Sequence, residues 1–229
     1  MNKNIQILVN FKLHKNGCGE NALKLAKVCE KVAKETNVNI VIAVNYINLE
    51  QIANSVSIPV FAQHVDAITS RSATGKIPAQ MIKEAGATGT LLNHAEHSIK
   101  EKTFKKTLEQ AKAQNLDVIF CTKSPRESKK IAKLHNSIKP KYIAYEPIKL
   151  IGSSCSITEK EPKKISKTNK ITGKTNLMVG AGIKTPKDIK NALSLGATGI
   201  LIASVITKSE TPYKTLTELA NAFKNNKTK

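Results

Sequence analysis

Tryptophan is absent from this sequence, and Arg71 and Arg126 are its only arginines. Acidic residues are scarce beside basic ones, 17 against 37, so the formal net charge of +20 comes almost wholly from lysine. The lysines are spread along the chain, with no basic stripe interleaved with aromatic residues, so nucleic-acid binding is not the expected main role. The charge instead indicates a solvated lysine coat or a field that attracts anionic substrates.

The chain also lacks long hydrophobic runs. None approaches the roughly 20 apolar residues that a membrane-spanning helix needs, so no membrane partner is expected. The short apolar stretch at residues 5–9 is interrupted at once by Asn10 and Lys12. It is too short for the apolar core of a signal peptide. We therefore expect a cytoplasmic protein.

The cysteines form no recognisable metal or disulfide pattern. Cys18, Cys29, Cys121 and Cys155 are far apart, with no Cys-x-x-Cys pair and no histidine at metal-ligand spacing. In a cytoplasmic chain, we expect these four cysteines to be reduced thiols. We expect neither a metal nor another cofactor.

Eight short apolar runs alternate with stretches of helical spacing, such as 21–36 and 187–195. Apolar strands covered by amphipathic helices are typical of a parallel sheet buried on both faces. Eight units of about 28 residues predict an α/β fold, a closed (β/α)8 barrel, with residues 1–229 as one domain and a frayed tail at 224–229. The expected strands are Ile5–Phe11, Ile40–Val44, Ile58–Ala62, Thr88–Leu92, Val118–Cys121, Tyr142–Tyr145, Leu177–Val179 and Gly199–Ala203.

Cap residues support this register. Thr185 followed by Pro186 predicts the start of a helix, with an N-cap residue and a proline at the first helical position. Thr211-Pro212 is the same pair before the last expected helix. Gly86 and Gly196 each begin the phrase Gly-Ala-Thr-Gly. Each phrase is typical of a helix end followed directly by a strand.

Polar residues follow several of the expected strands. Active sites of such barrels lie at the carboxyl ends of the strands, where this sequence places Asn10, Lys12, Gln63, His64, Asn93, His94, Glu146, Gly180, Gly182, Ala203 and Ser204. Lys12, His94 and Glu146 supply a cation, an imidazole and a carboxylate, which suffice to move a proton beside a carbonyl. Singly, each has an ordinary structural interpretation, and we expect His64 to be a satisfied loop histidine.

Longer phrases around these residues resemble the triosephosphate isomerase family over essentially the whole chain. Asn10-Phe11-Lys12 is similar to its first-strand motif, and Leu91-Leu92-Asn93-His94-Ala95-Glu96 to its histidine loop in the shorter archaeal branch. Pro59-Val60-Phe61-Ala62-Gln63-His64 also has the archaeal form. The glutamate, lid and phosphate-loop motifs are matched by Tyr145-Glu146-Pro147, Leu150-Ile151-Gly152, Gly180-Ala181-Gly182-Ile183 and Leu201-Ile202-Ala203-Ser204.

The resemblance implies a TIM barrel that interconverts dihydroxyacetone phosphate and D-glyceraldehyde 3-phosphate through an enediolate, in glycolysis and gluconeogenesis. By the same resemblance Glu146 is the base, His94 the neutral electrophile and Lys12 the stabiliser of negative charge. The implied substrate-binding residues are Asn10, Phe11, Lys12, Ile151, Gly152, Gly182, Ala203 and Ser204. Archaeal members suggest a homotetramer, with a dimer as the alternative.

The chain departs from the archaeal pattern at a few positions. Val205 stands where the pattern has glycine, Gly152-Ser153-Ser154 replaces Gly-Thr-Gly in the lid, and Lys149 replaces an acidic hinge residue. Because valine is a poor occupant of positive φ, we expect ordinary negative φ at Ser204–Val205. With no arginine in a phosphate motif, backbone N–H groups and a short helix start after the eighth strand would bind the phosphate.

Two other functions stay open at this stage. One is a different phosphate-binding barrel, an isomerase or lyase, which would share the last two loops without needing both His94 and Glu146. The other is a basic nucleic-acid-binding or scaffolding barrel without activity, which would tolerate the loss of both residues.

Overall fold

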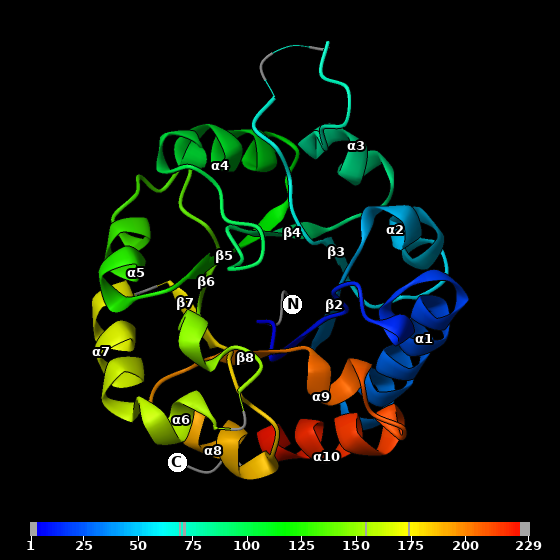
Figure 1. Cartoon of the computed structure of the whole chain (residues 1–229), viewed down its shortest axis with the longest axis vertical. Helices are drawn as coiled ribbons and strands as arrows, with labels where there is room; N and C mark the ends of the chain where they lie inside the picture. Colours follow the sequence, from blue (N-terminus) through cyan, green and yellow to red (C-terminus); the bar gives the residue numbers. More distant parts are fainter. Residues whose placement is uncertain (1–3, 69, 71, 154, 174, 225–229) are drawn as a thin grey trace.

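The computed structural model describes residues 4–68, 70, 72–153, 155–173 and 175–224. Eight parallel strands form a closed barrel in which each strand pairs with the next along the chain and β8 returns to β1. Figure 1 looks down this barrel and shows the strands as an inner ring with the helices outside. The strands are β1 Ile7–Asn10, β2 Ile40–Val44, β3 Val60–Ala62, β4 Gly89–Leu92, β5 Asp117–Thr122, β6 Tyr142–Tyr145, β7 Asn176–Val179 and β8 Gly199–Ile202.

The predicted (β/α)8 barrel is thus confirmed, and the predicted strands differ from the observed ones by at most two residues at either end. β3 shows why. Its expected start was Ile58, but pairing begins at Val60 because Pro59 has no N–H to donate to the ladder. The Pro59 carbonyl still accepts a hydrogen bond from the Ile42 N–H at 3.2 Å.

Two apolar layers fill the molecule, one on each face of the closed sheet. On β1, Ile7 and Val9 pack outward against the helices, while Leu8 packs inside the barrel, as the twofold alternation of a strand requires. The inner layer includes Tyr142, the first residue of β6, whose hydroxyl accepts the Ile5 N–H at 3.0 Å. The other buried residues of that layer are Val41, Ala43, Phe61, Leu91, Ile119, Cys121, Ala144, Met178 and Leu201.

The helices begin and end close to where their cap residues indicate. Thr185 and Asp188 form a reciprocal capping box at the start of α8, and Gly86 and Gly196 have the positive φ values of 88° and 97° expected after a helix. The helices are α1 Gly19–Thr36, α2 Tyr46–Ala53, α3 Ala79–Glu84, α4 Phe104–Ala113, α5 Pro125–Ala132, α6 Ile157–Lys160, α7 Pro162–Thr172, α8 Pro186–Ser194, α9 Ser204–Thr207 and α10 Pro212–Lys224, with 3-10 turns η1 Lys15–Gly17, η2 Glu101–Thr103 and η3 Ile148–Leu150.

Among these helices none is long and apolar enough to cross a membrane, as far as the described residues go. The expected frayed tail at 224–229 falls almost entirely outside the described residues, and Lys224 itself is the last residue of α10.

Candidate active site

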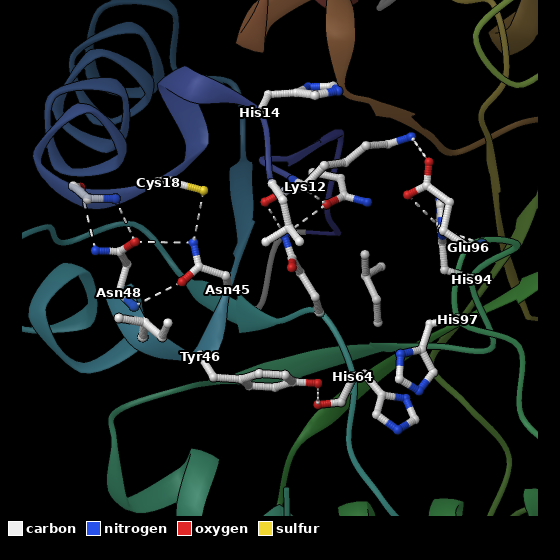
Figure 2. A pocket seen from close by; sticks show the side chains of 16 residues that line it. Lys12, His14, Cys18, Asn45, Tyr46, Asn48, His64, His94, Glu96 and His97 are labelled. Carbon is white, nitrogen blue, oxygen red and sulfur yellow. Dashed lines mark hydrogen bonds and ion pairs between the residues drawn. The ribbon is translucent and has the colours of Figure 1, made fainter. Parts of the chain in front are cut away.

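Two adjoining cavities open at the carboxyl ends of the strands. The smaller, called here the mouth cavity, has a volume of about 170 Å³. The larger, the side cavity, has about 670 Å³ and is the one drawn in Figure 2. Lys12, His14 and His94 line both, whereas Glu146 lines the mouth cavity. The mouth cavity also gathers most of the expected substrate-binding residues, namely Ile151, Gly152, Gly182, Ala203 and Ser204.

Lys12 occupies an unusual backbone conformation just after β1. Its φ of 51° is in the left-handed region, which costs free energy for a residue with a side chain. Neighbouring side chains hold it there: the Asn10 Oδ1 accepts the Lys12 N–H at 3.0 Å, and Gln63 Nε2 donates to the Lys12 carbonyl at 3.1 Å. The ammonium group is ion-paired with Glu96 Oε1 at 2.6 Å, as Figure 2 shows.

His94 follows β4 on a loop that is anchored by Asn93. Asn93 also has a positive φ, 59°, and its amide donates to Glu127 Oε1 at 3.1 Å and to the Cys121 carbonyl at 3.0 Å. The His94 Nδ1 receives the Glu96 backbone N–H at 3.2 Å. Because a backbone N–H can only donate, this nitrogen is unprotonated, which assigns the proton of the neutral ring to Nε2.

Glu146 is a buried carboxylate at the end of β6. Its residue is 5% exposed, and no hydrogen-bond partner for Oε2 occurs within the described part of the chain. That oxygen lies 3.8 Å from His94 Nε2, beyond hydrogen-bond distance. Burial raises the pKa of Glu146, while the nearby His94 and Lys12 act in the opposite direction. A desolvated acid in a cavity, with a specific titratable neighbour, is a candidate functional group.

Gly180 has a different role from the one its motif suggests. The sequence analysis places Gly180 with Gly182 in a phosphate-loop motif, but Gly180 does not have the positive φ of Gly182. A Cβ at this position would lie 2.7 Å from Glu146 Cδ and would overlap its Oε1. Glycine at position 180 therefore makes room for the Glu146 carboxylate.

Gly182 brings the lid, residues 147–156, against the loop after β7. Its φ is +73°, and a Cβ there would lie 2.9 Å from the Cys155 carbonyl carbon and overlap the oxygen. Lys184 ties the same two loops, because its Nζ donates to the Ser153 carbonyl at 2.9 Å. Lys149 lies in η3 within the lid, and Ser154, one of the departures from the archaeal pattern, lies outside the described residues.

The loop after β8 confirms the expected short helix. α9 begins at Ser204, directly after Ala203, and Val205 lies within it without a positive φ. The Val205 side chain is half-buried; it packs against the outer apolar layer and also borders the mouth cavity. Arg126 lies in the first turn of α5 and borders neither cavity, while Arg71 lies outside the described residues.

Two expectations need correction. Phe11, taken as a substrate-binding residue, is 0% exposed, belongs to the outer apolar layer and lines neither cavity, so its side chain is part of the core. His64 is not a satisfied loop histidine: neither ring nitrogen has a hydrogen-bond partner among the described residues. Its ring stacks on His97 with centroids 4.1 Å apart, and its Nε2 lies 3.6 Å from Asp66 Oδ1. Asn10 lines the side cavity rather than the mouth cavity.

Sequence reasoning also left three residues of the mouth cavity without a role: His14, Lys184 and Lys208. Lys184 and Lys208 follow the two glycine- and serine-containing loops by two and four residues. In a chain with so many lysines, only their position after those loops could have singled them out.

Comparisons with known proteins agree with this geometry. The profile of the family described as triosephosphate isomerase matches residues 5–223. A triosephosphate isomerase of Methanobacterium bryantii is 39% identical over 219 residues, which cover 94% of this chain and 95% of the relative. The enzymes of Pyrobaculum calidifontis and Methanocaldococcus jannaschii are 37% and 36% identical, over 93% of this chain and 94% and 97% of their own.

These matches extend over nearly the whole barrel and favour neither of the two other functions considered from the sequence. The chain belongs to the triosephosphate isomerase family.

Proposed function

We propose that this chain interconverts dihydroxyacetone phosphate and D-glyceraldehyde 3-phosphate, as its family does in glycolysis and gluconeogenesis, with Glu146, His94 and Lys12 as the catalytic groups. The observation that carries the assignment of the groups is the position of Glu146. Its buried Oε2 has no hydrogen-bond partner within the described residues and faces His94 Nε2 across 3.8 Å, on the wall of the cavity that Lys12 also lines.

Glu146 acts as the base. It takes a proton from the carbon next to the substrate carbonyl, the electrons of that C–H bond form the double bond of an enediolate, and the carbonyl oxygen takes the negative charge. A proton then moves from the hydroxyl oxygen on the first carbon to the former carbonyl oxygen, and Glu146 returns its own proton to the neighbouring carbon. The first carbon thereby becomes the new carbonyl and the former carbonyl carbon carries the hydroxyl, which gives the isomer. Burial raises the pKa of Glu146, which makes its carboxylate a better proton acceptor at neutral pH.

His94 and Lys12 stabilise the charge that develops on oxygen. The proton assigned to His94 Nε2 lets a neutral ring donate to an enediolate oxygen, and the Lys12 ammonium adds a fixed positive charge beside it. Both groups are held before substrate arrives, His94 by the Glu96 N–H and Lys12 by its 2.6 Å ion pair with Glu96. Donors that are already in place cost no reorganisation in the transition state, which is a main source of enzymatic rate.

The phosphate group would bind in the other half of the mouth cavity. Backbone N–H groups near Gly152, Gly182 and Ser204 replace the arginine that the motifs lack. Lys184 and Lys208 line the same cavity and supply positive charge from their side chains. This arrangement agrees with a dianionic substrate, because positive side chains gathered in one part of a small cavity attract ligands of the opposite charge to that part.

The Glu146→Gln variant tests the assignment. It keeps the shape of the side chain and removes the base, so kcat should fall by roughly 10²–10⁴-fold or more, while a phosphorylated substrate analogue still binds. Turnover is measured in a coupled assay with glyceraldehyde 3-phosphate. The matched control is Glu159→Gln, the same change at an exposed residue of α6, which should leave kcat unchanged. Near-normal turnover in Glu146→Gln would remove Glu146 from the mechanism.

We also propose that the enzyme works in the cytoplasm without a cofactor, as a homotetramer, with a dimer as the alternative. The support is the resemblance to archaeal members of the family. Sedimentation equilibrium over a range of protein concentrations measures the assembly directly, and a monomer at concentrations that give full activity would contradict it.

A further inference from the structure

His14 lies at the junction of the two cavities and has no part in the mechanism above. It follows Lys12 by two residues, before η1, and its partly buried side chain lines both the mouth cavity and the side cavity. Figure 2 shows His14 and Lys12 on the same loop. The residue is therefore placed where a bound phosphate would act on it.

A hydrogen-bonded chain connects His14 to the loop after β8. The His14 Nδ1 and the Thr207 Oγ1 are 2.6 Å apart, and the same Oγ1 lies 3.2 Å from the Ala203 carbonyl oxygen. A carbonyl can only accept, so the hydroxyl donates to Ala203 and accepts from a protonated His14 Nδ1. This assigns the proton of the neutral ring to Nδ1. When the ring becomes charged, the second proton is gained at Nε2 and the contact with Thr207 is kept.

Charged groups from three loops surround the ring. Lys12 comes from its own loop, Lys208 follows α9, and Glu96 comes from the loop after β4. Burial, then Lys208 and Lys12, lower the pKa of His14, and Glu96 raises it. An anion in the mouth cavity would add negative potential and favour the charged ring. Because binding linkage is reciprocal, a ring that is charged would bind the anion more tightly.

We propose that His14 is a further phosphate-binding residue, which takes up a proton at Nε2 when the phosphate group enters the mouth cavity and so couples substrate affinity to pH. The inference rests on the proposed function only in placing the phosphate in this cavity. Through its contact with Thr207, His14 also connects the loop that carries Lys12 to α9, which begins at Ser204. It therefore links the loop of a proposed catalytic residue to the proposed phosphate-binding segment.

Sulfate is the probe for the test, because it stays a dianion across the pH range in which histidine titrates. Its dissociation constant is measured calorimetrically between pH 5.5 and pH 8, without turnover. The unmodified enzyme should bind sulfate roughly three- to tenfold more tightly at the lower pH, as expected for one added charge a few ångströms from a partly exposed dianion.

The His14→Asn variant isolates the proton. An asparagine Nδ2 can take the place of the histidine Nδ1 and donate to Thr207, but asparagine cannot become charged. We expect this variant to lose the gain in sulfate affinity at low pH. KM at pH 6 should rise roughly three- to tenfold while kcat changes by less than about twofold, because a binding interaction common to ground and transition state is removed. The matched control is His135→Asn, an exposed histidine with a similar contact to Ser137 at 2.8 Å, which should behave as the unmodified enzyme.

A second measurement needs no stable variant. NMR titration of the histidine rings in the unmodified enzyme should show the His14 pKa rise by about 0.5–1 on saturation with sulfate, the equivalent of the same three- to tenfold linkage. An unmoved His14 titration, an unchanged pH dependence in His14→Asn, or a loss of kcat with unchanged KM would each overturn the proposal. The sulfate measurements do not require turnover, so they stand apart from a failure of Glu146→Gln to lose activity.

Discussion

The two halves of the mouth cavity are built from different parts of the chain. The half formed by the ends of β1, β4 and β6 presents side chains, those of Lys12, His94 and Glu146. The half formed by the lid and the loops after β7 and β8, called here the backbone half, includes Gly152 and Gly182, with φ of +74° and +73°, beside the side chains of Lys184 and Lys208.

Because of this difference, we expect substitutions in the first half to change mainly kcat and substitutions in the second half to change mainly KM. On the proposed mechanism, each group of the side-chain half moves a proton or stabilises charge, so a misplaced atom should lower kcat. On the same proposal, the N–H groups of the backbone half bind a phosphate that does not change during the reaction. Interactions of that kind are equal in ground and transition states and appear in KM.

Gly180→Ala is the sharpest test of the side-chain half, because it changes the position of the base without changing its chemistry. The added methyl would displace the Glu146 carboxylate, whose Cδ and Cγ lie 2.7 and 2.8 Å from the ideal Cβ. A displacement of about 1 Å at a reacting group can cost roughly 100-fold in rate. We expect a fall of about that size in kcat, with sulfate affinity unchanged, by steady-state kinetics and calorimetry.

Gly152→Ala serves as the control for adding a methyl group at the same cavity. Its φ is positive, but no atom lies within 4 Å of the ideal Cβ, so Glu146 should stay in place. Gly180→Ala with normal kcat would show that the carboxylate has room to move, and that its close fit against residue 180 is not needed for the reaction.

Gly182→Ala is the corresponding test of the backbone half. The methyl would meet the Cys155 carbonyl, and the positive φ of +73° would be strained as well, at a cost of about 1–3 kcal/mol. The lid must then move away from the loop after β7. We expect KM to rise about tenfold and kcat to fall by less, since the lost contacts are mainly those to the unreactive phosphate. A fall confined to kcat would contradict the division between the halves.

Gly173→Ala is the control for the loss of unfolding free energy expected in Gly182→Ala. Gly173 ends α7 with a φ of 60° and has no atom within 4 Å of the ideal Cβ. Gly173→Ala should lose about 1–3 kcal/mol from backbone strain alone, with normal KM. Comparing the free energies of unfolding of the two variants isolates the steric contribution of the lid.

Much of this molecule could be predicted from its sequence because a parallel barrel repeats one pattern. Near-continuous apolar runs fix the strands, and the carboxyl ends of those strands all lie at one mouth. That rule alone places Lys12, His94 and Glu146 on one cavity. The errors at strand ends are small and have local causes, such as the missing N–H of Pro59.

The remaining features depend on contacts between segments far apart in the chain. Position 180 needs a glycine because of the Glu146 carboxylate, which lies 34 positions earlier in the chain. His14 contacts Thr207, which is 193 positions later. The stacking of His64 on His97 likewise joins two loops. Periodicity and motif spacing describe a residue by its neighbours in sequence, so they cannot indicate contacts of this kind.

The smallest effect is expected at Val205, where the archaeal pattern has glycine. A glycine is required at such a turn only if the backbone has positive φ or if a side chain would block the ligand. Here the backbone at Val205 is helical and without positive φ, and the side chain packs partly against the outer apolar layer.

Val205→Gly therefore relieves no strain and removes some apolar packing and helix propensity, at a cost of about 1 kcal/mol in the free energy of unfolding. We expect KM to change by about two- to threefold and kcat to stay the same, because only uniform phosphate binding is affected. Steady-state kinetics of both enzymes decide the matter. A rise of kcat by orders of magnitude would mean that valine impairs the natural site, and that the backbone half of the cavity limits the reaction as well as the binding.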